Sequence, residues 1–180
     1  MNNTVYIAGD WEHDVGVVNK IVEWNNSPIH PIKFTYAHDL KQARDDSLKC
    51  SIKASLRARL ELSDKFILIV GTHTKSLTAG RCQWCESYNS YRHYCAKGKS
   101  PDNSSFIEYE CKKAIGLGLD ILVIYNSDRV DRRLCPDILY NRLNVEHIPF
   151  IIYKRSTMLG GGNTFFKQYN EEEITNFIMR

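Results

Sequence analysis

The chain has 180 residues, enough for one domain that buries about two-thirds of its unfolded surface. Hydrophobic residues make up 43% and charged residues 25% of it, as in ordinary globular proteins, and no apolar run approaches the length of a membrane-spanning helix. The net charge of +3 is too small, and the lysines and arginines are too scattered, to favour a nucleic-acid-binding protein.

The N-terminal residues MNNTVYIAGD lack the basic region and cleavage site of a secretion signal, so the expected location is the cytoplasm, without membrane attachment. In that compartment the six cysteines favour free thiols or a metal site over disulfides.

Five short apolar runs predict β-strands. They are TVYIAG (4–9), IKFTY (32–36), KFILIVG (65–71), LDILVIY (119–125) and IPFIIY (148–153). Three of them are almost continuously hydrophobic and rich in Ile and Val, which is typical of parallel strands covered on both faces. We therefore expect a central, mainly parallel sheet.

Helical spacing of apolar residues occurs at 14–24, 42–62 and 105–117, between the predicted strands. This alternation predicts an α/β fold, a flavodoxin-like three-layer sandwich around an open sheet of about five strands. Residues 1–180 are expected to form a single domain with one Cys- and Tyr-rich insertion at about 75–103.

The C-terminal region predicts a Gly-rich turn at GGGN, a returning strand and a final helix from about Glu171. GGGN lacks the Lys-Ser/Thr ending of a phosphate loop and does not lead directly into a helix, which favours a plain turn.

Polar and aromatic side chains follow three of the predicted strands. In open α/β sheets ligands bind beyond the carboxyl ends of the strands, where the strand order reverses. Taken singly, these side chains could cap helices or face water; together, an indole, carboxylates and hydroxyls suit a nucleotide or sugar. The candidate binding residues are Asp10, Trp11, Asp14, Asp39, Thr72 and His73, with His13 and His38 in the same loops.

Three other proteins of this fold do not match the sequence. A response-regulator receiver needs an aspartate at the end of the third strand, where this chain has Gly71, Thr72 and His73. A flavodoxin needs a phosphate loop after the first strand, but GDWEHDVG is too acidic for one. The G-x-G-x-x-G sequence of a dinucleotide-binding Rossmann domain is absent there.

Glu108 and Glu110 lie near the start of the predicted helix 105–117. In the plainer interpretation they stabilise the positive end of the helix dipole. Glu110 follows Phe106 by four residues, on the flank of the apolar stripe, so we expect it to lean over the sheet edge. Two residues along a helix turn a side chain by about 200°, so Glu108 should point elsewhere.

The segment SSFIEYECKKAIGLGLDILVIYNS (104–127) resembles the part of TIR and TIR-like domains that carries the NAD-cleaving glutamate. Glu110 matches that glutamate, and Phe106 the aromatic position before it, where many TIR domains have Trp. Upstream, VYIAGDWEHD resembles the first strand and its loop, and residues 34–74 resemble the second strand, second helix and third strand. The resemblance covers 4–127 and is closest to the bacterial TIR-like enzymes of Thoeris antiphage defence.

This resemblance implies an enzyme that cleaves the nicotinamide–ribose bond of NAD with Glu110 as the catalytic residue. Water as acceptor would give ADP-ribose, whereas the substrate's own adenine or ribose would give a cyclic product. The family further implies self-association and a separate effector protein that senses the product, with no cofactor beyond NAD as substrate. Two alternatives stay open: a non-catalytic TIR scaffold, and a nucleoside N-glycosidase or deoxyribosyltransferase with a similar cleft and carboxylate.

The insertion contains Cys82, Cys85, His93 and Cys95, a Cys-x2-Cys followed by His-x-Cys. Such residues can form a tetrahedral zinc site, which would stabilise a polar loop with little core of its own. The second half of the pattern has a non-standard spacing, so structural zinc is possible but not favoured over reduced cysteines packed among aromatic neighbours. The position of the insertion suggests a lid or a partner surface.

Overall fold

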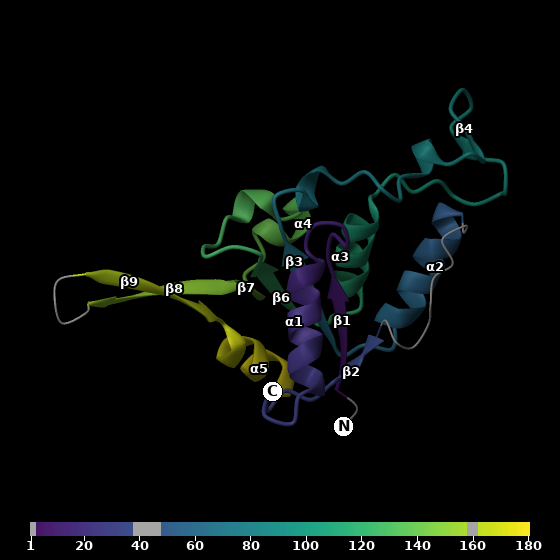
Figure 1. Ribbon diagram of the computed structural model, residues 1–180. Helices are drawn as coiled ribbons and strands as arrows, with labels where there is room; N and C mark the ends of the chain where they lie inside the picture. Colours follow the sequence, from purple (N-terminus) through teal and green to yellow (C-terminus); the bar gives the residue numbers. More distant parts are fainter. Residues whose placement is uncertain (1–2, 38–47, 158–161) are drawn as a thin grey trace.

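The computed structural model describes residues 3–37, 48–157 and 162–180. Its centre is a five-stranded, all-parallel sheet in the order β2-β1-β3-β6-β7 (Figure 1). The prediction of an α/β, flavodoxin-like fold is confirmed. The strands are β1 (Thr4–Ala8), β2 (Thr35–Tyr36), β3 (Lys65–Val70), β6 (Asp120–Tyr125) and β7 (Val145–Pro149).

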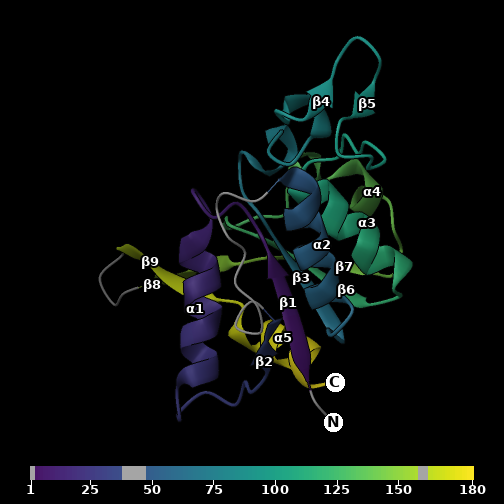
Figure 2. The same cartoon turned by 90° about the vertical axis from the view of Figure 1, so that its right-hand side faces the viewer.

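Two helical layers cover the two faces of the sheet (Figures 1 and 2). Alternate residues of β3 show why both are needed: Phe66 and Leu68 face one core, whereas Ile67 and Ile69 face the other. The first core is closed by α2 (Lys49–Leu60), α3 (Phe106–Gly116) and α4 (Asp137–Tyr140), and the second by α1 (Val15–Asn26) and α5 (Glu171–Met179). The part of the predicted helix 42–62 before residue 48 lies outside the described residues.

The prediction of one strand at 148–153 is wrong, because this apolar run spans two strands. β7 ends at Pro149, and the backbone N–H of Phe150 still bonds to the carbonyl of Tyr125, at 2.8 Å. The Phe150 ring is buried against Trp24, with 6.0 Å between ring centroids. The run is therefore apolar because Phe150 anchors the chain at the point where it leaves the sheet.

Beyond Phe150 the chain forms an antiparallel hairpin of β8 (Ile151–Thr157) and β9 (Asn163–Tyr169). The hairpin projects from the body as an arm, on the left of Figure 1. The predicted turn at GGGN lies partly outside the described residues, but the returning strand and the final helix from Glu171 are confirmed.

The insertion between β3 and α3 also projects from the body, at the upper right of Figure 1. It contains short 3-10 turns, η2 (Thr74–Ser76) and η3 (Cys82–Trp84), and a small hairpin of β4 (Tyr88–Asn89) and β5 (Tyr94–Cys95). A further turn, η4 (Arg132–Leu134), follows β6. Within the described ranges no helix is long and apolar enough to cross a membrane.

The cysteines of the insertion are free thiols, and Cys82 is buried while Cys85 and Cys95 are half-buried. Of the four aromatic residues expected to pack around them, Tyr88 is half-buried, whereas Trp84, Tyr91 and Tyr94 are exposed, with 67%, 90% and 45% of their surface open to solvent. In the part of the chain that the structure describes, no three His, Cys, Asp or Glu side chains lie together as metal ligands would.

Candidate active site

Asp10 and His13 form a pair at the carboxyl end of β1. The Nδ1 atom of His13 lies 2.8 Å from Oδ2 of Asp10, whose Oδ1 accepts the backbone N–H of Glu12 at 3.0 Å. Burial alone would raise the pKa of Asp10, but these hydrogen bonds outweigh it and lower the pKa. The same bond raises the pKa of His13, whose ring is exposed. The loop thus presents a fixed carboxylate and an imidazole at the sheet edge.

Asp14 is buried beside the loops that follow β3 and β6. Its Oδ1 accepts a hydrogen bond from the side-chain amide of Asn126 at 2.8 Å. A Cβ atom on Gly71 would lie 2.2 Å from the same oxygen, so the carboxylate packs directly on a glycine backbone. Burial raises the pKa of Asp14, and the bond from Asn126 opposes this only in part. Asp14 is positioned as the first residue before α1, yet its side chain does not cap that helix.

The loop after β3 completes this edge of the sheet. The ring of His73 lies against that of His13, with 4.3 Å between centroids. Thr72 is exposed in the same loop, and Trp11 has 49% of its surface exposed. The structure therefore brings Asp10, Trp11, Asp14, Thr72 and His73 to one edge, whereas Asp39 and His38 lie outside the described residues.

Glu110 occupies a different position from the one expected. It belongs to the buried stripe of α3, with Ile107, Cys111 and Ala114, and only 6% of its surface is exposed. Its Oε1 accepts a hydrogen bond from the hydroxyl of Tyr6 in β1. The expectation that Glu110 leans over the sheet edge is therefore wrong: its carboxyl group faces the sheet.

The environment of Glu110 brings its titration close to neutral pH. Burial raises its pKa from 4.5 to about 7, although the hydrogen bond from Tyr6 and the positive charge of Arg59 on α2 act in the opposite direction. Burial and the neighbouring carboxyl group also raise the pKa of Tyr6 well above its ordinary value, so the phenol keeps its proton. The pair is thus a hydroxyl donor and a carboxyl group that changes charge near pH 7.

The start of α3 is fixed by a capping box. The backbone N–H of Ser105 bonds to Oε2 of Glu108 at 2.7 Å, and the Ser105 hydroxyl accepts the N–H of Glu108 at 3.2 Å. The plainer interpretation of Glu108 is therefore confirmed. Phe106 is half-buried, and its ring packs on the backbone of Gly80, where an added Cβ would lie 2.6 Å from the ring.

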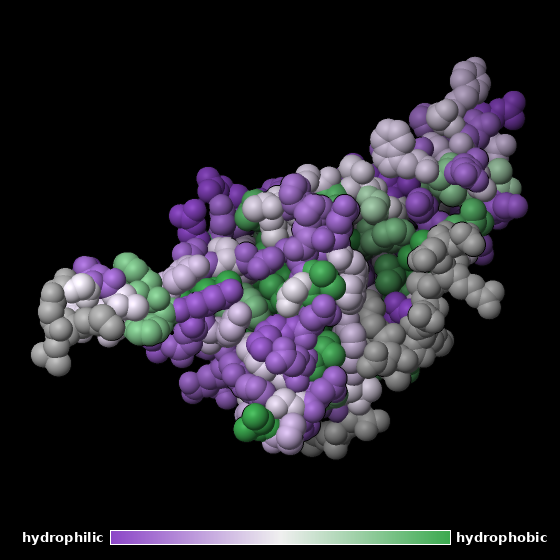
Figure 3. All heavy atoms as spheres, viewed as in Figure 1, coloured by the Kyte–Doolittle hydropathy of each residue, from purple (hydrophilic) through white to green (hydrophobic). Residues whose placement is uncertain are grey.

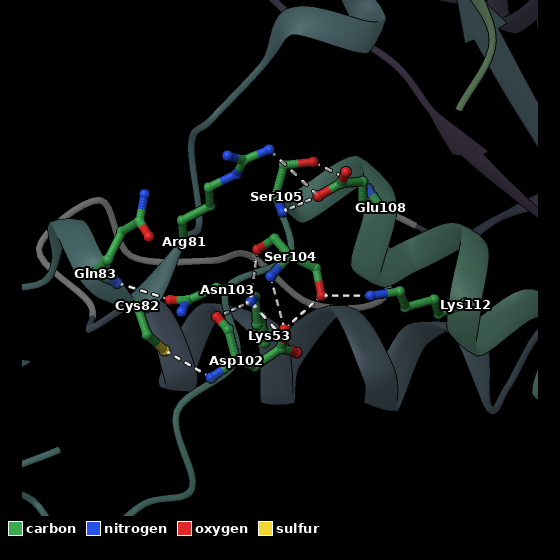
Figure 4. Close-up of polar contacts among 10 residues, drawn as sticks. All are labelled: Lys53, Arg81, Cys82, Gln83, Asp102, Asn103, Ser104, Ser105, Glu108 and Lys112. Carbon is green, nitrogen blue, oxygen red and sulfur yellow. Dashed lines mark hydrogen bonds and ion pairs between the residues drawn. The ribbon is translucent and has the colours of Figure 1, made fainter. Parts of the chain in front are cut away.

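Lys53 on α2 binds the end of the insertion, the segment that leads into α3 (Figure 4). This buried lysine on α2 donates to the carbonyl oxygens of Asp102 at 3.0 Å and Ser104 at 2.8 Å, and its Nζ lies 3.4 Å from the Asp102 carboxylate. The Sγ of Cys82 accepts the backbone N–H of Asp102 at 3.2 Å. These contacts hold the segment that leads into α3, and so the position of Glu110.

A scan against protein-family models finds no match for this chain, and a search of curated proteins finds none either. A functional assignment therefore depends on the chemistry of these side chains.

Three residues of the site were not among the sequence candidates: Tyr6, Arg59 and Asn126. Tyr6 carried the best signal, because it is the one aromatic residue of the apolar run 4–9, and a buried tyrosine hydroxyl usually has a hydrogen-bond partner. Arg59 lies at a core-facing position of α2, but a long basic side chain in a helix is usually solvated. Asn126 follows the fourth predicted strand, at the same edge as the other candidates.

Proposed function

We propose that this chain is a TIR-like enzyme that cleaves the nicotinamide–ribose bond of NAD and makes a cyclic ADP-ribose-type signal in bacterial antiphage defence. The proposal depends most on Glu110, an ionisable group on the sheet-facing stripe of α3, bonded to Tyr6 and with a pKa of about 7. An acid in a core costs free energy of folding, which supports a chemical role for it. The resemblance of residues 104–127 to TIR domains suggests which role this is, that of the NAD-cleaving glutamate.

The proposed reaction breaks the bond between ribose C1′ and the nicotinamide nitrogen. The bonding electrons leave with nicotinamide, whose ring loses its positive charge, and an oxocarbenium-like ribose remains. Ionised Glu110 stabilises this cation, and the Tyr6 hydroxyl fixes the orientation of the carboxylate. Water then attacks C1′ and loses a proton to give ADP-ribose, or a nitrogen or hydroxyl of the same substrate attacks and closes a ring.

The sheet-edge residues supply binding groups in this proposal. The carboxylates of Asp10 and Asp14 are buried in the single chain, so they accept hydrogen bonds from ribose hydroxyls only after the atoms that cover them move, whereas the exposed indole of Trp11 can stack on the nicotinamide or adenine ring directly. Thr72 and His73 add contacts from the neighbouring loop. Asp39 keeps its sequence-based assignment as a further contact.

The burial of Glu110 gives a reason for control by assembly. With 6% of its surface exposed in the single chain, Glu110 meets a substrate only after the atoms that cover it move. TIR-type enzymes act when assembled, with one subunit completing the site of another, and a closed single chain fits that behaviour. The cyclic product would then be sensed by a separate effector protein.

The deciding experiment is mass spectrometry of concentrated protein, and of lysate from phage-infected cells, incubated with NAD. The expected result is release of nicotinamide with a companion product of cyclic mass, abolished by Glu110→Gln. Glu108→Gln is the matched control, because it removes a glutamate from the same helix that contacts Ser105 and Arg81 instead of Tyr6. Equal nicotinamide release by wild type and Glu110→Gln would contradict the proposal.

A substrate panel separates the alternatives. Free base released from nucleosides or deoxynucleosides, with NAD untouched, would identify an N-glycosidase or deoxyribosyltransferase that uses the same carboxylate. Antiphage activity that survives Glu110→Gln would identify a non-catalytic scaffold. The variant is suitable for both tests because glutamine keeps an oxygen that accepts the Tyr6 hydroxyl.

A further inference from the structure

The β8–β9 arm exposes large apolar side chains to solvent. Phe165 has 63%, Phe166 has 53% and Tyr153 has 55% of its surface exposed. Figure 3 shows hydrophobic residues on the surface of this arm, away from the body of the molecule. Aromatic side chains in such positions are typical of a binding surface.

The arm also has free backbone groups along its edges. β8 and β9 pair with each other, and within the described residues no third strand joins them. A seven-residue strand with an open edge is a template for another strand, because its outward N–H and C=O groups have no backbone partner among the residues that the structure describes. Lipid headgroups and nucleic acids do not complete such a ladder, whereas a strand from a protein does.

The sequence of β9, NTFFKQY, is complementary to itself in one antiparallel register. With Phe166 opposite Phe166 of a second copy, Phe165 lies opposite Lys167, and Thr164 lies opposite Gln168. These are an aromatic pair, two cation–aromatic pairs and two hydrogen-bonding pairs, all of which stabilise neighbouring strands. No two like charges face each other.

β8 does not have this property. An antiparallel pairing about its central residue would place Lys154 opposite Lys154 of the second copy, and like charges directly opposite are destabilising. The arm carries Lys154, Arg155 and Lys167 and no acidic residue between Ile151 and Tyr169, so its charges penalise most pairings of two arms. The β9 register separates the cations, because Lys154 and Arg155 then lie on the outer strands.

We propose that two copies of this chain associate through antiparallel pairing of β9 with β9, around a two-fold axis that passes between the two Phe166 residues. The two arms then form a four-stranded sheet, with the bodies at opposite ends. Such an interface is isologous, because the same surface of both copies takes part and every contact between two different residues occurs twice, once in each direction. The pairing does not depend on NAD cleavage, so it stands or fails separately from the proposed function.

Sedimentation equilibrium over a range of protein concentrations tests this interface. Wild-type protein is expected to form dimers, and Phe166→Lys should raise the dimer dissociation constant at least about tenfold, because it places two ammonium groups face to face between the copies and a lysine opposite Lys154 within each hairpin. Phe166→Glu separates the two effects: its carboxylates still face each other between the copies but are attracted to Lys154 within each hairpin, and it should weaken the dimer as well. An equimolar mixture of the two variants should dimerise again, since Lys then faces Glu, and this recovery is specific to a register in which position 166 meets itself.

Tyr153→Thr is the matched control, because it removes a similarly exposed aromatic residue from the other strand without placing a charge opposite Lys167, its register partner, and it should leave the dimer intact. Circular dichroism should show that all variants keep the wild-type fold. A monomer at every concentration, a dimer unaffected by Phe166→Lys, or a mixture that fails to recover would each overturn the proposal. Wild-type protein that stays monomeric but binds vesicles of phosphatidylserine and phosphatidylcholine would assign the arm to membranes and overturn it as well.

Discussion

The hydroxyl of Tyr6 donates a hydrogen bond to the carboxyl group of Glu110, joining β1 to α3 across 104 residues of sequence. Both side chains are buried between the sheet and its helical layer. Burial raises the pKa of Glu110 to about 7, so the carboxyl group changes charge within the physiological range. Stability and the proposed activity should both respond to that change.

Glu110 should make the protein less stable as pH rises from 4.5 toward 7. An acid with a higher pKa in the folded than in the unfolded state holds its proton more tightly when folded, so the free energy of unfolding falls across that window. Between about pH 5 and about pH 7.5 the expected fall is about 2 kcal/mol. Urea unfolding should show it in wild type and not in Glu110→Gln; equal pH dependence in both proteins would contradict the assigned environment.

Tyr6→Phe should move the pH range over which the free energy of unfolding falls to higher pH. The Tyr6 hydroxyl stabilises the ionised carboxylate, so its loss raises the pKa of Glu110 further and costs about 1–3 kcal/mol above neutral pH. Tyr125→Phe is a suitable control, because it removes a buried hydroxyl that bonds to Nδ1 of His147 at 3.0 Å instead. The same urea titrations should show the window shifted in Tyr6→Phe and unmoved in Tyr125→Phe.

The parallel sheet was predictable because its strands are continuous apolar runs covered on both faces, a pattern with few other solutions. The boundary between β7 and β8 at Phe150 was not predictable, because the sequence around a buried residue that anchors the chain at the end of a sheet looks like the interior of a longer strand. Among the site residues, Asp10, Asp14 and His73 were found because parallel strands place their carboxyl ends at one edge.

The burial of Glu110 was missed although its spacing fits the buried stripe. Ile107, Glu110, Cys111 and Ala114 are separated by three, one and three residues, as on one face of a helix. A carboxylate at this position made burial look unfavourable, because charged groups are rarely buried without a partner. That partner, Tyr6, lies on a distant strand, so only the fold shows why the position is tolerated.

Gly71→Ala should displace Asp14. The new Cβ would lie 2.2 Å from Oδ1 of Asp14, a buried oxygen that cannot move without breaking its bond to Asn126, and we expect a loss of about 1–3 kcal/mol. In Gly16→Ala the new Cβ meets nothing within 4 Å on an exposed face of α1, so stability should rise by up to about 1 kcal/mol. Chemical denaturation of both variants measures the contrast, and similar values would show that the site relaxes around the added methyl group.

Lys53→Met should destabilise the protein more than Lys75→Met, although the ion pair of Lys75 with Asp137 is shorter, at 2.6 Å against 3.4 Å for Lys53 with Asp102. Lys53 is buried and also donates to two carbonyl oxygens; without it the Asp102 carbonyl keeps the backbone N–H of Cys82, but the buried Ser104 carbonyl loses its lysine donor, so about 2–4 kcal/mol should be lost. Lys75 and Asp137 are exposed, and water replaces their contact at a cost below about 1 kcal/mol. Thermal and urea unfolding of the two variants measure both losses of stability. Equal losses would mean that burial does not set the strength of these ion pairs. They would also mean that Lys53 is not what holds the segment leading into α3.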